Sequence, residues 1–178
     1  MIPFRALLSG AILIVSLPAF GQQAPPDAAA GITNLKRLDS TVACAGVTTP
    51  ESMRAVKEMG FASVVNLREA SEPNANIEGE TAAAKAAGLR YVHLPLQRES
   101  PDPAVADRFL IVARDPANQP MFIHCASGNR AAAMWLIKRA VVDGWSIDRA
   151  MTEAQSLGLE HEPWKTYAID YASAHKGK

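Results

Sequence analysis

Short runs of branched apolar residues alternate along the chain with longer segments in which apolar residues recur at helical spacing. The short runs predict strands over 38–43, 61–67, 89–96 and 121–124. The periodic segments predict helices, one opening at Pro50 and others over 78–87, 103–114, 131–142, 147–157 and from Pro163 to near His175. Strands that alternate with helices indicate a single α/β domain, with a central, mostly parallel sheet flanked by helices.

Polar residues mark the expected starts of three of these helices. Thr49, Asp102 and Ser146 each precede a periodic segment, and Pro50 and Pro103 follow the first two directly. Small hydroxyl and carboxylate side chains favour the N-cap, and proline favours the first helical position. We therefore expect these three residues to be N-caps.

The first 21 residues have the pattern of a secretory signal peptide. Arg5 precedes an uncharged run from Ala6 to Phe20 that ends in small residues at Ala19 and Gly21. This run is shorter than the roughly 20 apolar residues that span a bilayer as a helix. We expect a signal peptide over 1–21, an Ala/Pro-rich linker over 22–32 and a domain over 33–178. The mature protein is then periplasmic or secreted, without stable membrane association.

Composition excludes several classes of partner and cofactor. The chain has 18 Lys and Arg against 18 Asp and Glu, so it lacks the basic excess of nucleic-acid-binding proteins. The four histidines do not recur at metal-ligand spacing, and there is no glycine-rich nucleotide loop. We expect neither a metal nor another cofactor.

One segment, HCASGNR at 124–130, carries the candidate chemistry. It lies between a predicted strand and a predicted helix, where backbone N–H groups and the helix dipole favour an anion. Arg130 adds a fork of donors suited to a tetrahedral oxyanion, and the same field favours the Cys125 thiolate, a nucleophile. His124 is expected to support the loop by hydrogen bonding. A nucleophile beside an anion site indicates attack on phosphorus or sulfur.

The sequence here resembles the cysteine-dependent phosphatases of the tyrosine and dual-specificity type, especially their small bacterial members. The resemblance includes AGVTTPESMRAVKEMGFASVVNLRE at 45–69 and AGLRYVHLPL at 87–96, and extends over roughly 33–160. It implies their α/β fold, Cys125 as the nucleophile that forms a phosphocysteine, and Arg130 as a phosphate ligand. The loop residues that complete the anion site would be Ala126, Ser127, Gly128 and Asn129.

The loop departs from that family in two ways. Four residues separate Cys125 from Arg130, whereas the familiar loop has five, and such shorter loops also resemble rhodanese-type sulfurtransferases. Ala131 stands where the family usually has a hydroxyl that assists departure of the thiolate, a role that Ser127 would have to take over.

The general acid of the resembled family is an aspartate about thirty residues before the cysteine. The matching position is Arg98, which cannot serve as a general acid near neutrality because a guanidinium does not lose its proton in proteins. Glu99 and Asp102 lie in the same loop, so either carboxylate is a candidate acid.

We therefore expect a cysteine-dependent phosphatase that cleaves phosphate monoesters of a protein or small molecule. The alternatives are a rhodanese-like sulfurtransferase with a persulfide on Cys125, and an inactive oxyanion-binding module. Arg68 follows a strand and is expected either to contact the substrate or to form a solvated salt bridge. Three hypotheses stay open for Cys44: a buried apolar residue, a disulfide partner of Cys125, or a redox switch.

Overall fold

The computed structural model describes residues 31–175 and 177, so the predicted signal peptide lies outside the described residues. Its centre is a five-stranded sheet in the order β1-β2-β5-β3-β4. The strands are β1 (Lys36–Leu38), β2 (Val42–Ala45), β3 (Ser63–Asn66), β4 (Arg90–His93) and β5 (Met121–His124). β1 pairs antiparallel with β2, and the other three pairs are parallel. The central position of β5 places the loop that follows it in the middle of the carboxyl edge.

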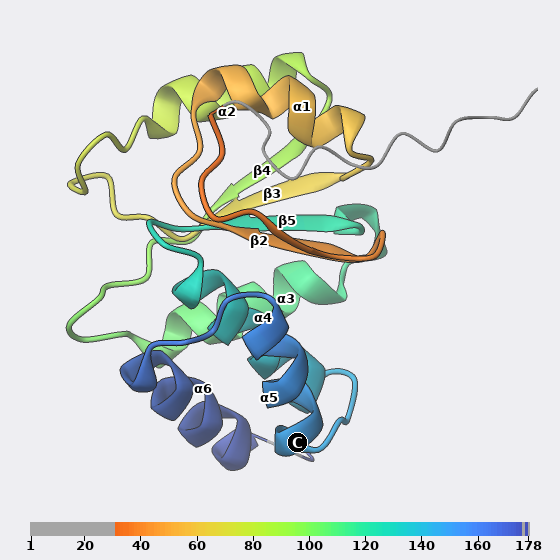
Figure 1. The fold of residues 1–178 in the computed structure, drawn as a ribbon, viewed down its shortest axis with the longest axis vertical. Helices are drawn as coiled ribbons and strands as arrows, with labels where there is room; N and C mark the ends of the chain where they lie inside the picture. The colour runs from red at the N-terminus through yellow and green to blue at the C-terminus, as the bar shows by residue number, and fades with distance from the viewer. Residues whose placement is uncertain (1–30, 176, 178) are drawn as a thin grey trace, which may run out of the picture.

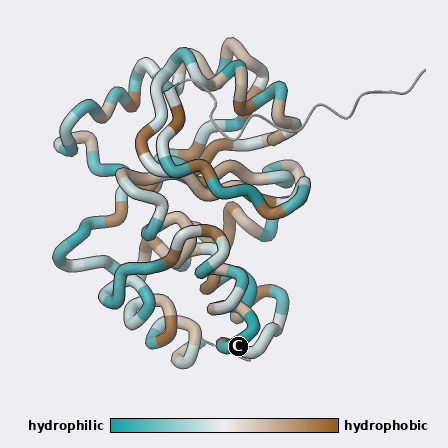
Figure 2. The backbone as a smooth tube through the Cα atoms, in the orientation of Figure 1, coloured by the Kyte–Doolittle hydropathy of each residue, from teal (hydrophilic) through white to brown (hydrophobic). Residues whose placement is uncertain are grey.

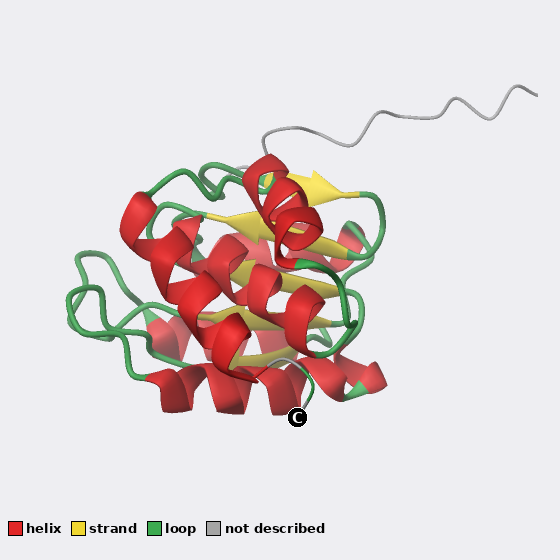
Figure 3. Ribbon diagram, turned by 90° about the horizontal axis from the view of Figure 1, so that it is seen from below, coloured by secondary structure: helices red, strands yellow, loops and turns green. Residues whose placement is uncertain are grey.

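Helices cover both faces of the sheet (Figure 1). One layer contains α1 (Met53–Glu58), which continues from the 3-10 turn η1 (Pro50–Ser52), and α2 (Ile77–Ala86). The other contains α3 (Pro103–Arg114), α4 (Asn129–Val141), α5 (Ile147–Ser156) and α6 (Glu162–His175), with η2 (Pro116–Asn118) leading into β5. The view onto this second layer shows its helices lying across the sheet (Figure 3). The predicted α/β class is confirmed.

Alternation along the strands divides the core into two parts. Ile123 and Cys44 belong to the cluster beneath α3 to α6, whereas Phe122 and Ala43 belong to the cluster beneath α1 and α2. Apolar positions follow the strands between the two helical layers (Figure 2). α4 packs against α3, α5 and α6, which explains why it is apolar on nearly every side.

Two local predictions were wrong. The range 38–43 is not one strand, because Asp39 adopts a positive φ of 44° and its carboxylate accepts the Thr41 N–H, which turns the chain between β1 and β2. Thr49 precedes η1 but its side chain does not cap it. Asp102 and Ser146 cap α3 and α5 as expected.

Within the described part of the chain, no helix has the length and apolar character needed to cross a bilayer.

Burial on α4 gives a direct test of the core. Ile137 is 0% exposed, whereas Ile111 on α3 is 67% exposed. We expect Ile137→Ala to lower the free energy of unfolding by about 2–5 kcal/mol, because it leaves a cavity between the sheet and three helices. The matched Ile111→Ala should change it by no more than about 0.5 kcal/mol. Urea denaturation of both variants measures the difference, and equal effects would contradict this assignment of the core.

Candidate active site

The HCASGNR segment forms a loop between the end of β5 and the start of α4. The Cys125 N–H donates to the Ala45 carbonyl at 3.1 Å, and Ser127 forms an isolated bridge with Gly46, so the loop lies against the end of β2. A side chain at Gly46 would come within 3.0 Å of the Ala126 carbonyl. Glycine at position 46 therefore permits this close approach of the two backbones.

Gly128 turns the loop into α4 and brings an amide to the sulfur. Its φ is +100°, a left-handed conformation that strains any residue with a side chain. In this conformation the Gly128 N–H points back and donates to Cys125 Sγ at 3.2 Å. Cys125 is 1% exposed and lies just before the N-terminus of α4. The amide and the positive end of the helix both stabilise a thiolate.

Arg130, in the first turn of α4, is held in a fixed position by a carboxylate and two carbonyls. Its Nη1 donates to Glu72 Oε1 at 2.7 Å and its Nη2 to Glu72 Oε2 at 2.8 Å. Nη1 also donates to the carbonyls of Leu67 at 3.0 Å and Leu96 at 2.9 Å. Such a bidentate pair orients the guanidinium, here 2% exposed, as well as balancing its charge.

The charges in this cluster depend on one another. Burial alone would lower the pKa of Arg130, but the hydrogen bonds to Glu72 and the charge and proximity of Cys125 raise it above its ordinary value. Burial alone would raise the pKa of Glu72, and the hydrogen bonds from Arg130 and the Glu69 amide lower it instead. Both side chains are therefore ionised at neutral pH, and Arg130 lies close to the sulfur.

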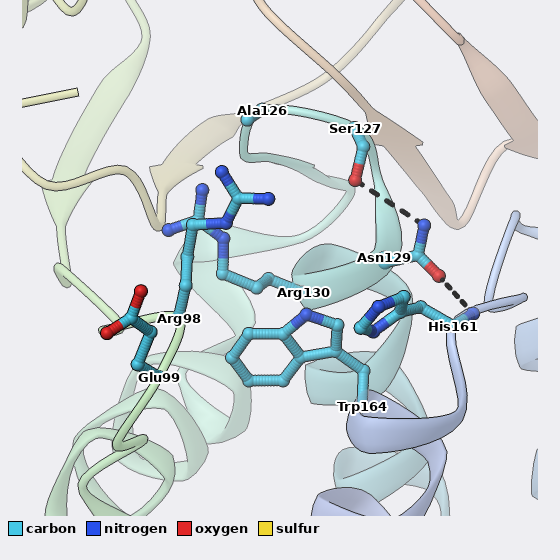
Figure 4. A pocket seen from close by; sticks show the side chains of 8 residues that line it. All are labelled: Arg98, Glu99, Ala126, Ser127, Asn129, Arg130, His161 and Trp164. Carbon is cyan, nitrogen blue, oxygen red and sulfur yellow. Dashed lines mark hydrogen bonds between the residues drawn. The ribbon is translucent and has the colours of Figure 1, made fainter. Parts of the chain in front are cut away.

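The loop opens into a cavity of about 450 Å³ (Figure 4). The side chains that line it come from three parts of the chain: Arg98, Glu99, Ala126, Ser127, Asn129, Arg130, His161 and Trp164. The structure thus brings Arg130 and every predicted loop residue except Gly128 to the cavity wall, together with one of the two candidate acids. Cys125 is buried directly before Ala126, the first loop residue that lines the cavity.

Asn129 explains how the C-terminal segment reaches this cavity. Its Oδ1 accepts the backbone N–H groups of Glu160 and His161, both at 2.8 Å, while its Nδ2 lies 3.4 Å from Ser127 Oγ. These bonds fasten the start of α6 to the loop and place His161 and Trp164 on the cavity wall (Figure 4). The sequence contains no motif that marks these two residues, because they reach the site only through the packing of α6 on α4.

His124 lies on the opposite side of the loop, within a buried polar network. Its Nδ1 is 3.0 Å from Thr48 Oγ1 and its Nε2 is 3.3 Å from Glu80 Oε2. Glu80 also accepts hydrogen bonds from Thr48 at 2.9 Å, Asn66 at 2.8 Å and Tyr91 at 2.7 Å. The His124 ring is 0% exposed and Glu80 is 1% exposed. The network holds the residue before Cys125 rigidly between β5 and α2.

Two expected site residues lie elsewhere. Arg68 is 2% exposed and is absent from the cavity wall, because its guanidinium is 3.4 Å from Glu72 and donates to the carbonyls of Pro73 and Asn74. Arg68 therefore lies outside the wall of this cavity, and its contacts order the loop that carries Glu72. The same loop contains Glu69 and Glu72, and the sequence has no signal that distinguishes the carboxylate that binds Arg130.

Asp102 is the second displaced residue. Its carboxylate accepts the Ala104 N–H at 2.9 Å as the N-cap of α3, and it lines a separate cavity together with Arg108. The structure therefore does not bring Asp102 to Cys125. Glu99 does line the main cavity, but its carboxylate is directed away from Arg130 (Figure 4).

Cys44 and Cys125 are both free thiols in this structure. Cys44 lies in β2, paired in register with Ile123 and 0% exposed. Burial, together with the nearby charge of Cys125, raises the pKa of Cys44 well above its usual value. Cys44 is therefore a protonated core residue here, consistent with the first of its three hypotheses. Ala131, which has no hydroxyl, is also fully buried.

Comparison with known proteins gives one family and a shared fold. Residues 34–142 match the family model described as beta-lactamase hydrolase-like protein, phosphatase-like domain. This span contains all five strands and the whole HCASGNR loop. No curated protein matches the chain by sequence.

Three solved structures have the same fold. A putative phosphatase (DUF442) from Shewanella putrefaciens is 21% identical, with 83% of this chain and 94% of that chain covered and a TM-score of 0.67. A putative phosphatase from Neisseria meningitidis is 18% identical, with 78% and 99% covered and a TM-score of 0.65. P. aeruginosa TpbA, as a cysteine-to-serine variant in complex with pTyr, is 22% identical, with 78% and 82% covered and a TM-score of 0.56.

The Glu80 network predicts a pH dependence of stability. Burial would raise the pKa of Glu80, but the hydrogen bond and charge of His124, with the hydroxyls of Tyr91 and Thr48, lower it below its usual 4.5. A lowered carboxyl pKa stabilises the fold above the unfolded value, and this stabilisation is lost as pH falls through the folded pKa. We expect Glu80→Gln to cost about 1–3 kcal/mol at neutral pH and to weaken the dependence of stability on pH below 4.5.

Chemical denaturation between neutral and acidic pH measures this effect. Glu58→Gln, an exposed position on α1, is the matched control and should keep the wild-type profile. A Glu80→Gln profile parallel to that of the wild type would show that the network does not hold Glu80 ionised.

Proposed function

The chain belongs to the family described as beta-lactamase hydrolase-like protein, phosphatase-like domain, and from this premise we propose that it is a cysteine-dependent phosphatase. The observation that carries the proposal is a backbone donor directed at the cysteine sulfur in a loop that lines a cavity. The Gly128 N–H donates to Cys125 Sγ, and Arg130, held by Glu72, lines the same cavity. This arrangement binds a tetrahedral dianion next to a nucleophile.

The reaction proceeds in two steps. The Cys125 thiolate attacks phosphorus, an S–P bond forms, and the bond to the leaving oxygen breaks. The loop amides and Arg130 stabilise the charge on the equatorial oxygens in the transition state. Water then attacks the phosphocysteine, which releases inorganic phosphate and restores the thiolate. Of the two predicted acids, Glu99 is the one that lines the cavity.

The substrates that we propose are phosphate esters of proteins or small molecules. The structure of TpbA in complex with pTyr supports an aryl phosphate as the first test compound. The match to a phosphatase-like family favours this function over a sulfurtransferase or an inactive binding module.

We expect the protein to hydrolyse p-nitrophenyl phosphate and the Cys125→Ser variant to lose at least about 10³-fold in kcat/KM, because the thiolate is the nucleophile. Cys44→Ala, which changes a buried cysteine outside the cavity, is the control and should remain within about threefold of wild type. Release of nitrophenol measures both. Thiocyanate formation from thiosulfate and cyanide, or phosphate binding without turnover, would contradict the proposal.

We further propose that the protein is exported, to the periplasm or beyond, after removal of residues 1–21. Support comes from the uncharged run after Arg5 and the small residues at Ala19 and Gly21. Expression of the full chain should yield a mature N-terminus at Gln22, measured by mass spectrometry of the exported fraction. The control is a variant with charged residues in the 6–20 run. This variant should remain in the cytoplasm with its N-terminus uncleaved. An unprocessed wild-type chain in the cytoplasm would contradict export.

A further inference from the structure

Arg98 is the group in the cavity whose role the proposed function does not explain. It is exposed, it lines the cavity, and it has no ion-pair partner within residues 31–175. Figure 4 shows its guanidinium directed toward the loop, on the same side of the cavity as that of Arg130. The glutamate next to it in sequence, Glu99, extends in another direction (Figure 4).

The buried cations beneath the cavity already have a carboxylate partner. Arg68 and Arg130 share the carboxylate of Glu72, at 3.4 Å and 2.7 Å. Arg98 has no such partner within the described residues, so it is the cation available for a further negative charge on the substrate or on its leaving group.

The positions of the carboxylates in and around the cavity also favour a leaving group that carries a negative charge. Asp102 caps α3 and faces a different cavity, and within the described residues the Glu99 carboxylate has no hydrogen bond to the loop or to Arg130. An alcohol, whose pKa is far above neutrality, or a phenol, with a pKa of about 10, needs a proton as it departs. A phosphate group has a second pKa of about 6 and departs as an anion without one. A guanidinium stabilises such an anion directly.

We propose that the preferred substrate is a phosphoanhydride, in which the terminal phosphoryl group is joined to a second phosphate that Arg98 binds as it leaves. The proposal rests on the proposed function, since Cys125 remains the nucleophile. The thiolate attacks the terminal phosphorus and the S–P bond forms. The bond from that phosphorus to the bridging oxygen breaks, and the oxygen keeps the electron pair as part of the departing phosphate. Water then cleaves the phosphocysteine to inorganic phosphate and releases one proton to solvent.

The experiment compares methyl diphosphate with methyl phosphate, two compounds that differ only in the leaving group, and uses p-nitrophenyl phosphate as the reference for basal activity. Release of inorganic phosphate gives kcat and KM for each. We expect kcat/KM for methyl diphosphate to exceed that for methyl phosphate by at least about 100-fold. Arg98→Ala should lower kcat/KM for methyl diphosphate by about 10–100-fold, and by at least tenfold more than for p-nitrophenyl phosphate.

Three variants separate the charge of Arg98 from other effects. Arg98→Lys should recover part of the loss, because it keeps the charge but not the fork of donors. Arg108→Ala removes an exposed arginine that lines the separate cavity and should leave all three compounds unaffected. Glu99→Gln should leave methyl diphosphate turnover unchanged, because that leaving group needs no proton.

The outcomes distinguish this inference from the function on which it rests. Hydrolysis of p-nitrophenyl phosphate without a preference for methyl diphosphate overturns the inference and leaves the phosphatase in place. An equal loss on all compounds in Arg98→Ala, or a loss on methyl diphosphate in Glu99→Gln, also overturns it. If none of the compounds is hydrolysed through Cys125, the proposed function itself fails.

Discussion

The site depends on one buried cation that must be paired. Arg130 is 2% exposed, and a guanidinium removed from water is tolerated only when its charge and its donors are satisfied. Glu72 neutralises its charge, and the carbonyls of Leu67 and Leu96 accept further hydrogen bonds from its Nη1. These partners follow β3 and β4, whereas Arg130 itself follows β5. One side chain therefore joins three neighbouring strand ends and fixes the loop that surrounds Cys125.

A second polar network stabilises the loop from the opposite face of the sheet. His124 precedes Cys125 in the chain and is held by Thr48 and Glu80, which come from the segment after β2 and from α2. Since successive strand residues point to opposite faces, His124 and Cys125 are supported by different helical layers. The nucleophile is thus placed by two buried networks, which also meet at Asn66: its Nδ2 donates to Glu80 and its Oδ1 accepts the Arg68 N–H. Rigid support of this kind keeps the donors in position before a substrate arrives.

The cavity above the loop is built from segments that have no role in the nucleophile itself. Asn129 fastens the start of α6, and this contact brings His161 and Trp164 to the wall. The loop before α3 contributes Arg98 and Glu99 from the opposite side. The start of α6 and the loop before α3 therefore form the surroundings of a bound phosphoryl group, whereas the loop at the strand ends positions the nucleophile. Relatives with the same fold can accordingly differ in substrate.

The sequence by itself was sufficient for the helix order and for three of the five strands, for the Asp102 and Ser146 caps, and for the position of the Cys125 to Arg130 loop between a strand and a helix. Each of these depends on interactions among residues close together in the chain, such as apolar periodicity, a cap or a glycine turn. The hairpin at Asp39 was not predicted, because the apolar pattern continues through it. The strand ends there because Asp39 adopts a positive φ and its carboxylate accepts the Thr41 N–H. Tertiary structure alone decided that Glu72 binds Arg130, that Glu80 binds His124, that His161 and Trp164 reach the cavity and that Arg68 does not. These contacts join residues distant in sequence, and a polar side chain finds its partner only when the packing of the sheet and helices removes water and leaves few alternatives.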